Sequence, residues 1–121
     1  KNYFSFIMIL TLTYEFSVPL FAQGVDSVFL KSAIQKLEHA RTYTLQVAEA
    51  MPVEQFGFKP TDESMTFGKQ LHHLAENLGW LSSAYLKNES NPVSKIQPTN
   101  KEAIIQELII AYDYSLQALQ T

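Results

Sequence analysis

One stretch of the chain, residues 66–87, constrains the fold most strongly, because its hydrophobic residues repeat with helical periodicity. At about 100° per residue, one narrow sector of the predicted helix contains Phe67, Leu71, Leu74, Leu78, Leu81 and Tyr85. A neighbouring stripe contains His73, Asn77, Trp80 and Ala84. The charged side contains Lys69, His72, Glu76, Ser83 and Lys87. We therefore predict that His73 lies at the flank of the core and that His72 faces the solvent.

A preceding helix is predicted from about Asp26 to Met51, with Asp26 or Ser27 as its N-cap. Pro52 should end it, because proline disfavours helical geometry in the residue before it. Its inward stripe is expected to contain Leu30, Ile34, Leu37, Arg41, Leu45 and Ala48. His39 lies opposite this stripe, so we interpret it as a surface residue.

A third helix is predicted from Thr99 onward, because Thr99 and Glu102 have the spacing of a capping box. Its buried stripe is expected to contain Ile105, Leu108, Tyr112, Leu116 and Leu119. Three amphipathic helices in this order predict an all-α, up-down four-helix bundle of which this chain supplies about three helices. The open side would be exposed, covered by the N-terminal segment, or buried in an oligomer such as a homodimer.

Two connectors separate these helices. The first, Val53–Met65, is long for a turn between helices, and we expect Phe56 and Phe58 to anchor it to the bundle. The second, Asn88–Pro98, is polar and contains two prolines, which is typical of a loop.

Composition narrows the function classes. The chain has 121 residues, enough for one domain, and a formal net charge of −3 without a cluster of basic residues, so nucleic-acid binding is not expected. It contains no cysteine, which excludes disulfides and thiolate nucleophiles. A metal site would have to use His, Asp or Glu side chains.

The first 23 residues resemble a signal peptide, with Lys1 as a minimal basic end, an apolar run from Phe4 to Leu12, and a possible cleavage region around Ala22. The helical domain would then comprise residues 24–121, and the protein would be exported or periplasmic without a membrane span. Glu15 interrupts the apolar stretch, so a buried N-terminal strand or helix in a cytoplasmic protein is the alternative. The chain does not begin with Met, and its last predicted helix has no stop signal, so we expect neither end to be natural.

Two segments, Met51–Pro60 and Thr66–Ala75, resemble the DinB superfamily of DinB/YfiT-like metalloenzymes. The resemblance implies a four-helix bundle that holds a divalent metal ion, usually nickel or zinc, through three histidines. One ligand comes from the second helix, and the position that matches it here is His73. The other two form an H-x-x-x-H pair on the last helix. Some relatives are thiol-dependent transferases or isomerases, so a metal-dependent hydrolase or transferase acting on a thiol-type small molecule is the implied function.

The chain departs from this pattern because it has only three histidines, His39, His72 and His73, and no H-x-x-x-H pair. Adjacent side chains diverge by about 100° on a helix, so His72 and His73 are poorly placed to bind one ion. Truncation before a fourth helix is the simplest account, and degeneration of the site is the alternative. A non-catalytic bundle for oligomerisation or partner binding therefore stays open as a second function.

No catalytic residue is indicated by any other motif. Asn77 and Trp80 are the side chains that we expect to line a pocket, although packing between helices explains them equally well. Glu76, Glu107 and Asp113 are interpreted as solvated residues.

Overall fold

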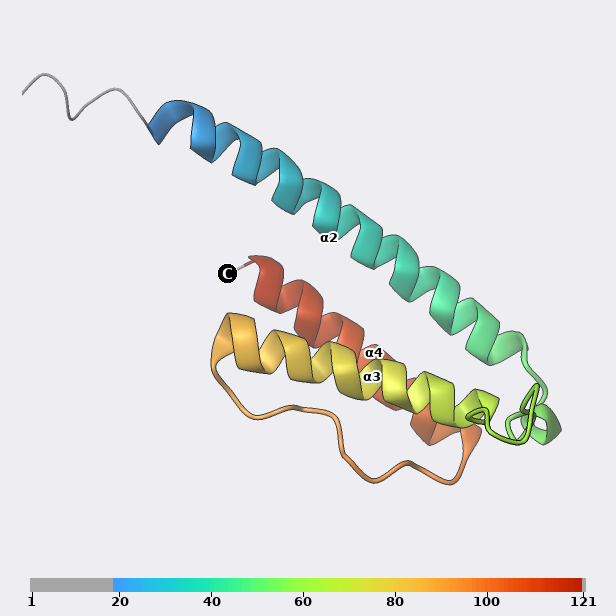
Figure 1. Ribbon diagram of the computed structural model, residues 1–121. Helices are drawn as coiled ribbons and strands as arrows, with labels where there is room; N and C mark the ends of the chain where they lie inside the picture. The colour runs from blue at the N-terminus through green and yellow to red at the C-terminus, as the bar shows by residue number, and fades with distance from the viewer. Residues whose placement is uncertain (1–18, 121) are drawn as a thin grey trace, which may run out of the picture. The chain divides into compact units, whose positions relative to one another are not determined.

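The computed structural model describes the backbone of residues 19–120 and the side chains of residues 26–120, and within them it contains three long helices and no strand. Helix α2 spans Pro19–Ala50, α3 spans Phe67–Ser82, and α4 spans Lys101–Gln120 (Figure 1). A short 3₁₀ turn, η1, spans Val53–Gln55, and a π-helical turn, η2, continues α3 over Ser83–Lys87. The predicted all-α fold is confirmed.

The chain divides into two compact units, Lys1–Ala33 and Ile34–Thr121. Most of the predicted signal peptide lies outside the described residues, although residues 19–23 belong to α2. None of the described helices has the length and hydrophobicity needed to cross a membrane.

Helix α2 begins at Pro19, so the prediction of an N-cap at Asp26 or Ser27 was wrong. Proline fits the first turn of a helix. Asp26 and Ser27 are residues that often cap a helix, but here they lie inside one, because α2 has already begun at Pro19. Leu30 is exposed, but the rest of the predicted stripe turns inward: Leu37 and Leu45 pack against the core and Ala48 is fully buried. His39 is exposed, as predicted.

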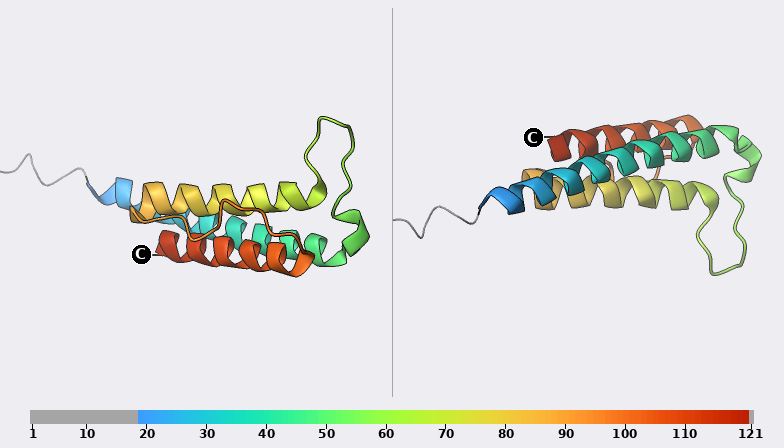
Figure 2. Two further views of the ribbon diagram at one scale, coloured as in Figure 1. Left: turned by 90° about the horizontal axis from the view of Figure 1, so that it is seen from below. Right: turned by 90° about the horizontal axis from the view of Figure 1, so that it is seen from above.

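Helices α3 and α4 form the closest helix pair and lie side by side in both views of Figure 2. Both helices bury small residues: Gly68, Ala75, Gly79 and Ser82 on α3, and Ala111, Ser115 and Ala118 on α4. Ser82 Oγ donates to Ser115 Oγ at 2.7 Å, which satisfies both buried hydroxyls together with the bond from Ser115 to the Ala111 carbonyl.

The core around this pair contains Ala48, Leu71, Ala75, Val93, Ile104, Leu108, Ala111 and Tyr112. The prediction for α4 was therefore right for Leu108 and Tyr112. It was wrong for Leu116 and Leu119, which are only partly buried. The smaller neighbouring residues Ser115 and Ala118 occupy the buried positions instead.

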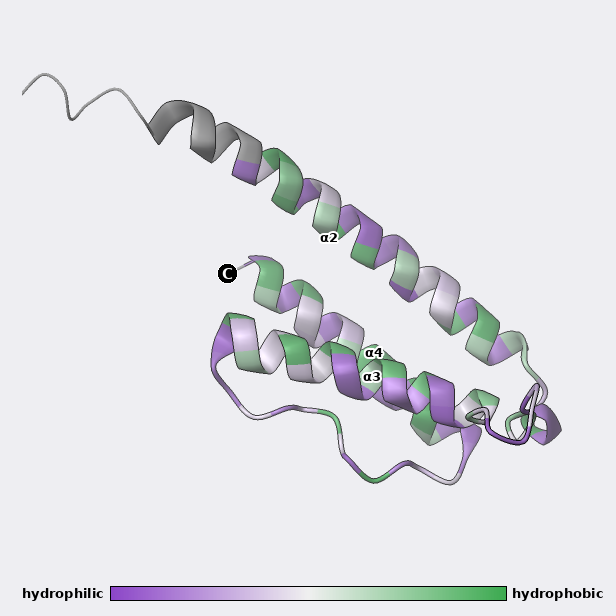
Figure 3. Ribbon diagram, viewed as in Figure 1, coloured by the Kyte–Doolittle hydropathy of each residue, from purple (hydrophilic) through white to green (hydrophobic). Residues whose placement is uncertain are grey.

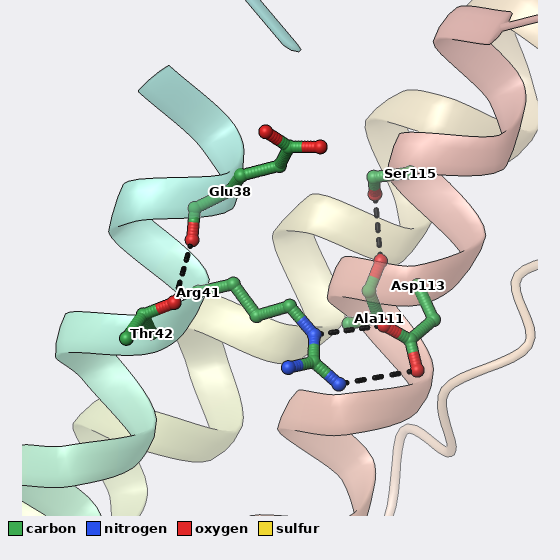
Figure 4. A network of polar contacts seen from close by, with 6 residues as sticks. All are labelled: Glu38, Arg41, Thr42, Ala111, Asp113 and Ser115. Atoms are coloured by element: carbon green, nitrogen blue, oxygen red, sulfur yellow. Dashed lines mark hydrogen bonds and ion pairs between the residues drawn. The ribbon is translucent and has the colours of Figure 1, made fainter. Parts of the chain in front are cut away.

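Polar contacts join the C-terminal half of α2 to α4. Arg41 Nε donates to Asp113 Oδ1 at 2.8 Å, across the two helices shown in Figure 4. One turn further along α2, Thr44 Oγ1 and the Tyr112 hydroxyl form a hydrogen bond of 3.0 Å. Asp113 therefore has an ion-pair partner and is not simply solvated.

Thr66 caps α3 as predicted, because its Oγ1 accepts a hydrogen bond of 3.2 Å from Lys69 N. Phe56 also anchors the first connector as predicted, with its ring edge-on to Phe67 at 5.3 Å. Phe58 was predicted wrongly, since its side chain is 56% exposed. It is the carbonyl of Phe58 that holds the connector, by accepting a hydrogen bond from Phe67 N.

Helix α4 is capped one residue later than predicted. Asn100 Oδ1, not the hydroxyl of Thr99, accepts a hydrogen bond of 2.7 Å from a backbone amide in the first turn, that of Ala103. Lys101 then reaches back to α2, where its Nζ donates to the carbonyls of Glu49 and Met51 at 2.6 and 2.7 Å.

Candidate functional site: the two histidines of α3

The two adjacent histidines of α3 lie in different environments, as predicted, but the prediction assigned the two environments to the wrong residues. His72 is 5% exposed, and His73 is an exposed residue. The buried side of α3 contains Leu71 and the small residues Gly68, Ala75 and Gly79 as well as His72. Helix α4 contacts this side at His72 and Ser82, and the loop residues Asn91 and Val93 lie against Gly79. The larger side chains of the predicted stripe, including Leu74 and Leu81, stay partly exposed.

His72 is held by Glu107 of α4. The Nδ1 atom of His72 lies 2.6 Å from Oε2 of Glu107, whose side chain is mostly buried. The contact is a hydrogen bond between the two side chains, and it becomes an ion pair when the imidazole is protonated and the carboxyl is ionised. The other ring nitrogen, Nε2, is buried and has no hydrogen-bond partner. Glu107 was interpreted as a solvated residue, and this interpretation was wrong, because a buried partner reaches it across the closest helix contact.

His73 lies on the opposite side of this arrangement, toward the solvent. Its Nε2 atom is 3.0 Å from Nδ2 of Asn77, one turn further along α3. The same side carries large hydrophobic residues: Trp80 is 49% exposed and packs edge-on against Tyr85, which is 73% exposed. We call the set of Leu74, Trp80, Leu81 and Tyr85 the exposed apolar face of α3. Hydrophobic positions occur along the whole of α3 and α4 in Figure 3.

The described residues do not complete a metal site. Among them, no group of three His, Cys, Asp or Glu side chains is arranged to hold an ion. His73 is exposed, but the side chain hydrogen-bonded to it is an amide, and His72 is paired with Glu107 in the α3–α4 contact. The described part of the chain therefore does not supply the ligands of a three-histidine metal site.

A pocket of about 510 Å³ lies near the N-terminal ends of α3 and α4, but the histidines do not line it. Its walls include Phe56, Thr66, Asn100, Lys101 and Ile104. Two of its polar groups are already engaged, because Asn100 caps α4 and Lys101 binds the end of α2. Trp80, which we predicted to line a pocket, lies on the exposed apolar face and not here.

These features define a helical bundle protein with a buried histidine–glutamate pair and a separate exposed histidine on the same helix. The model of the DinB superfamily matches residues 36–121, which is most of the chain. The protein belongs to the DinB superfamily. No curated protein and no solved structure matches the chain.

Proposed function

We propose that this chain is a divalent-metal-binding bundle of the DinB type, with His73 as one of the metal ligands. The observation that supports this proposal is the exposure of His73 on α3 while its neighbour His72 is buried and paired. Of the two histidines on this helix, only His73 has a ring open to an external ligand. Its position is also the one that the family resemblance assigns to the metal.

Asn77 would orient the ring of His73. A ligating histidine usually hydrogen-bonds through its second ring nitrogen, which fixes the tautomer and the direction of the lone pair. In the structure Nδ2 of Asn77 lies next to Nε2 of His73. A half-turn of the amide would let its oxygen accept a hydrogen bond from Nε2–H, so that Nδ1 of His73 presents its lone pair to the ion. The imidazole nitrogen is a ligand that nickel and zinc both accept.

Within the described residues, no group of three His, Cys, Asp or Glu side chains is arranged to hold an ion. The remaining ligands would therefore come from a further helix, as in the family pattern, or from a second copy of the chain. When bound, a divalent ion with open coordination positions supplies Lewis-acid chemistry, and a thiol-type small molecule is the substrate class that the resemblance suggests.

The test is a comparison of metal affinity between histidine variants. Binding of nickel and zinc is measured by titration calorimetry and by metal analysis after dialysis, for the wild type, His73→Ala and His39→Ala. Loss of a ligand should weaken binding by roughly a hundredfold or more, whereas His39→Ala, on the exposed side of α2, should match the wild type. Asn77→Ala should give an intermediate loss of roughly ten- to a hundredfold. Equal binding in His73→Ala, or no binding in the wild type, would reject the proposal.

The second candidate function is a non-catalytic interaction module, and the exposed apolar face of α3 favours it. Large exposed apolar groups that lie together often mark a protein–protein contact. Sedimentation analysis should then show self-association that increases with concentration, and Leu81→Glu should abolish it. Ile96→Glu is the matched control, because Ile96 is 82% exposed on the loop before α4. A wild type that stays monomeric at all concentrations would contradict this function.

A further inference from the structure

The pocket near the N-terminal ends of α3 and α4 is formed by three segments that are far apart in the sequence: the connector after α2, the start of α3, and the residues around the start of α4. The connector is held against α3 by a backbone hydrogen bond of 2.9 Å from Gly68 N to the Phe56 carbonyl. The first turn of α4 is held to the end of α2 by Lys101 Nζ. The fold itself therefore fixes the walls of the pocket.

One part of the wall is apolar. Ile104 is only 3% exposed, and Phe56 is partly buried. Both side chains lie against Gly68, where a Cβ atom would stand 3.2 Å from Phe56 Cδ1 and 3.3 Å from Ile104 Cδ1. The volume of about 510 Å³ is in the range of small-molecule sites, which combine a mostly apolar wall with a few polar groups.

The rest of the wall is polar and carries a positive charge. Among the described residues that line the pocket, Lys101 is the only charged one, and the nearby Glu54 and Glu102 are not part of the wall. The ammonium group donates to two backbone carbonyls but forms no ion pair with a carboxylate of residues 26–120. Gln97 and Thr99 also line the pocket, and neither side chain has a hydrogen-bond partner in the same range. These groups favour an anion.

The positive charge lies beside the apolar part of the wall, because Lys101 Nζ is 5.6 Å from the centroid of the Phe56 ring. A ligand that matches both features is amphipathic, with a negative group next to a hydrophobic body. One ammonium group balances the single charge of a carboxylate, whereas a phosphate carries nearly two charges at neutral pH. The wall therefore suits a carboxylate better than a phosphate.

We propose that this pocket binds a small carboxylate with an apolar body, whose charged head lies at Lys101 and whose body lies against Phe56 and Ile104. The amide of Gln97 and the hydroxyl of Thr99 supply hydrogen bonds to the head. The histidines of α3 do not line the pocket, so this site is separate from the metal ligand proposed above.

The test is a titration of the metal-free protein with hydrocinnamate, followed by heteronuclear NMR of the backbone amides. Because no metal is present, the result does not depend on the proposed metal site. Binding should saturate at millimolar concentrations, weaken in high salt, and shift the signals of residues 53–57, 66–68 and 97–104. Hydrocinnamamide has the same body and a neutral head. It should bind roughly tenfold more weakly, because a hydrogen bond between two charged groups is much stronger than one to a neutral acceptor.

Lys101→Met should weaken hydrocinnamate roughly tenfold and leave the affinity for hydrocinnamamide unchanged. The matched control is Lys95→Met, which removes an exposed lysine of the preceding loop that does not line the pocket and should behave like the wild type. Circular dichroism compares the helix content of the variants. If Lys101→Met does not fold, the double variant Gln97→Leu/Thr99→Val keeps the Lys101 bonds and should weaken hydrocinnamate several-fold. Three results would overturn the proposal: no saturable binding to the wild type, equal affinities for the acid and the amide, or shifts centred on the exposed apolar face of α3.

Discussion

Arg41 of α2 and Asp113 of α4 form a two-point contact, with Nε 2.8 Å and Nη2 3.4 Å from the two carboxylate oxygens. The pair joins helices that are far apart in sequence (Figure 4). Both side chains are partly exposed, at 31% and 55%, so water screens much of their attraction. The geometry of the Arg41–Asp113 pair is good, but the pair contributes little to the free energy of unfolding.

For Arg41→Gln we expect a loss of no more than about 1 kcal/mol in the free energy of unfolding, and a smaller loss in high salt. Urea denaturation at low and high ionic strength measures both values. The control is Lys59→Gln, which removes an exposed pair with Asp62 only three residues away and should change almost nothing. A large loss that does not depend on salt would show that Arg41 acts mainly through packing of its aliphatic stem.

The His72–Glu107 pair should be far more sensitive to the loss of one partner. Glu107→Leu leaves Nδ1 of His72 without its hydrogen-bond partner in a buried position, which should cost about 1–3 kcal/mol of stability. The double variant His72→Leu/Glu107→Leu replaces both groups with apolar ones and should recover most of that loss. A double-mutant cycle by urea denaturation gives the coupling energy. Additive effects of the two changes would contradict the pairing.

Gly79 and Gly57 provide a matched test of close packing. A Cβ at Gly79 would overlap the Asn91 side chain, whereas a Cβ at Gly57 would meet no atom within 4 Å. Gly79→Ala should therefore lower stability by about 1–3 kcal/mol, despite the better helix propensity of alanine. Gly57→Ala should be close to neutral. Thermal and urea unfolding of the two variants make the comparison, and a stabilised Gly79→Ala would show that the loop shifts at no cost.

Tyr114 should lose its proton at a higher pH than an ordinary tyrosine does. Partial burial of the phenol, and then the hydrogen bond and negative charge of Glu89, raise the pKa of Tyr114 above its usual value near 10. Folding favours the protonated phenol, so its contribution to stability is present below about pH 10 and is lost as the pH rises through the pKa in the folded state.

Glu89→Gln should lower the pKa of Tyr114 toward the usual value, because it removes the charge and leaves a neutral acceptor. Titration of the tyrosine ring signals by NMR resolves this residue among the six tyrosines of the chain. An identical titration in the two proteins would exclude Glu89 as a cause of the shift.

The ends of the helices were predictable where a neighbouring side chain determines them. Pro52 and Thr66 are such residues, and α2 does end and α3 does begin beside them. The cap of α4 was missed by one residue because Thr99 and Asn100 are both good N-caps, and backbone geometry chooses between them. The start of α2 has no comparable signal, so its position at Pro19 did not follow from Asp26 or Ser27.

The candidate site was predictable only in part, because periodicity shows which residues share a sector but not which sector a neighbouring helix covers. On α3, the sector with the largest hydrophobic residues was expected to be the core. The structure confirms Leu71 as a core residue and packs Phe67 and Leu78 against the core, but it leaves Leu74, Leu81 and Tyr85 exposed and buries Gly68, Ala75 and Gly79. His72 therefore moved from the expected surface to the interior. Its bond to Glu107 spans two helices, and no local pattern in the sequence indicates such a contact.

The ammonium group of Lys101 closes the last turn of α2, since α2 has no basic residue of its own at that end. Lysine side chains stabilise the terminal carbonyls of a helix, but here the lysine comes about fifty residues later in the chain. During synthesis on the ribosome, α2 emerges long before residue 101 does. The carbonyls of Glu49 and Met51 therefore lack this partner until the start of α4 has left the exit tunnel, so the end of α2 gains its cap only when α4 begins to form.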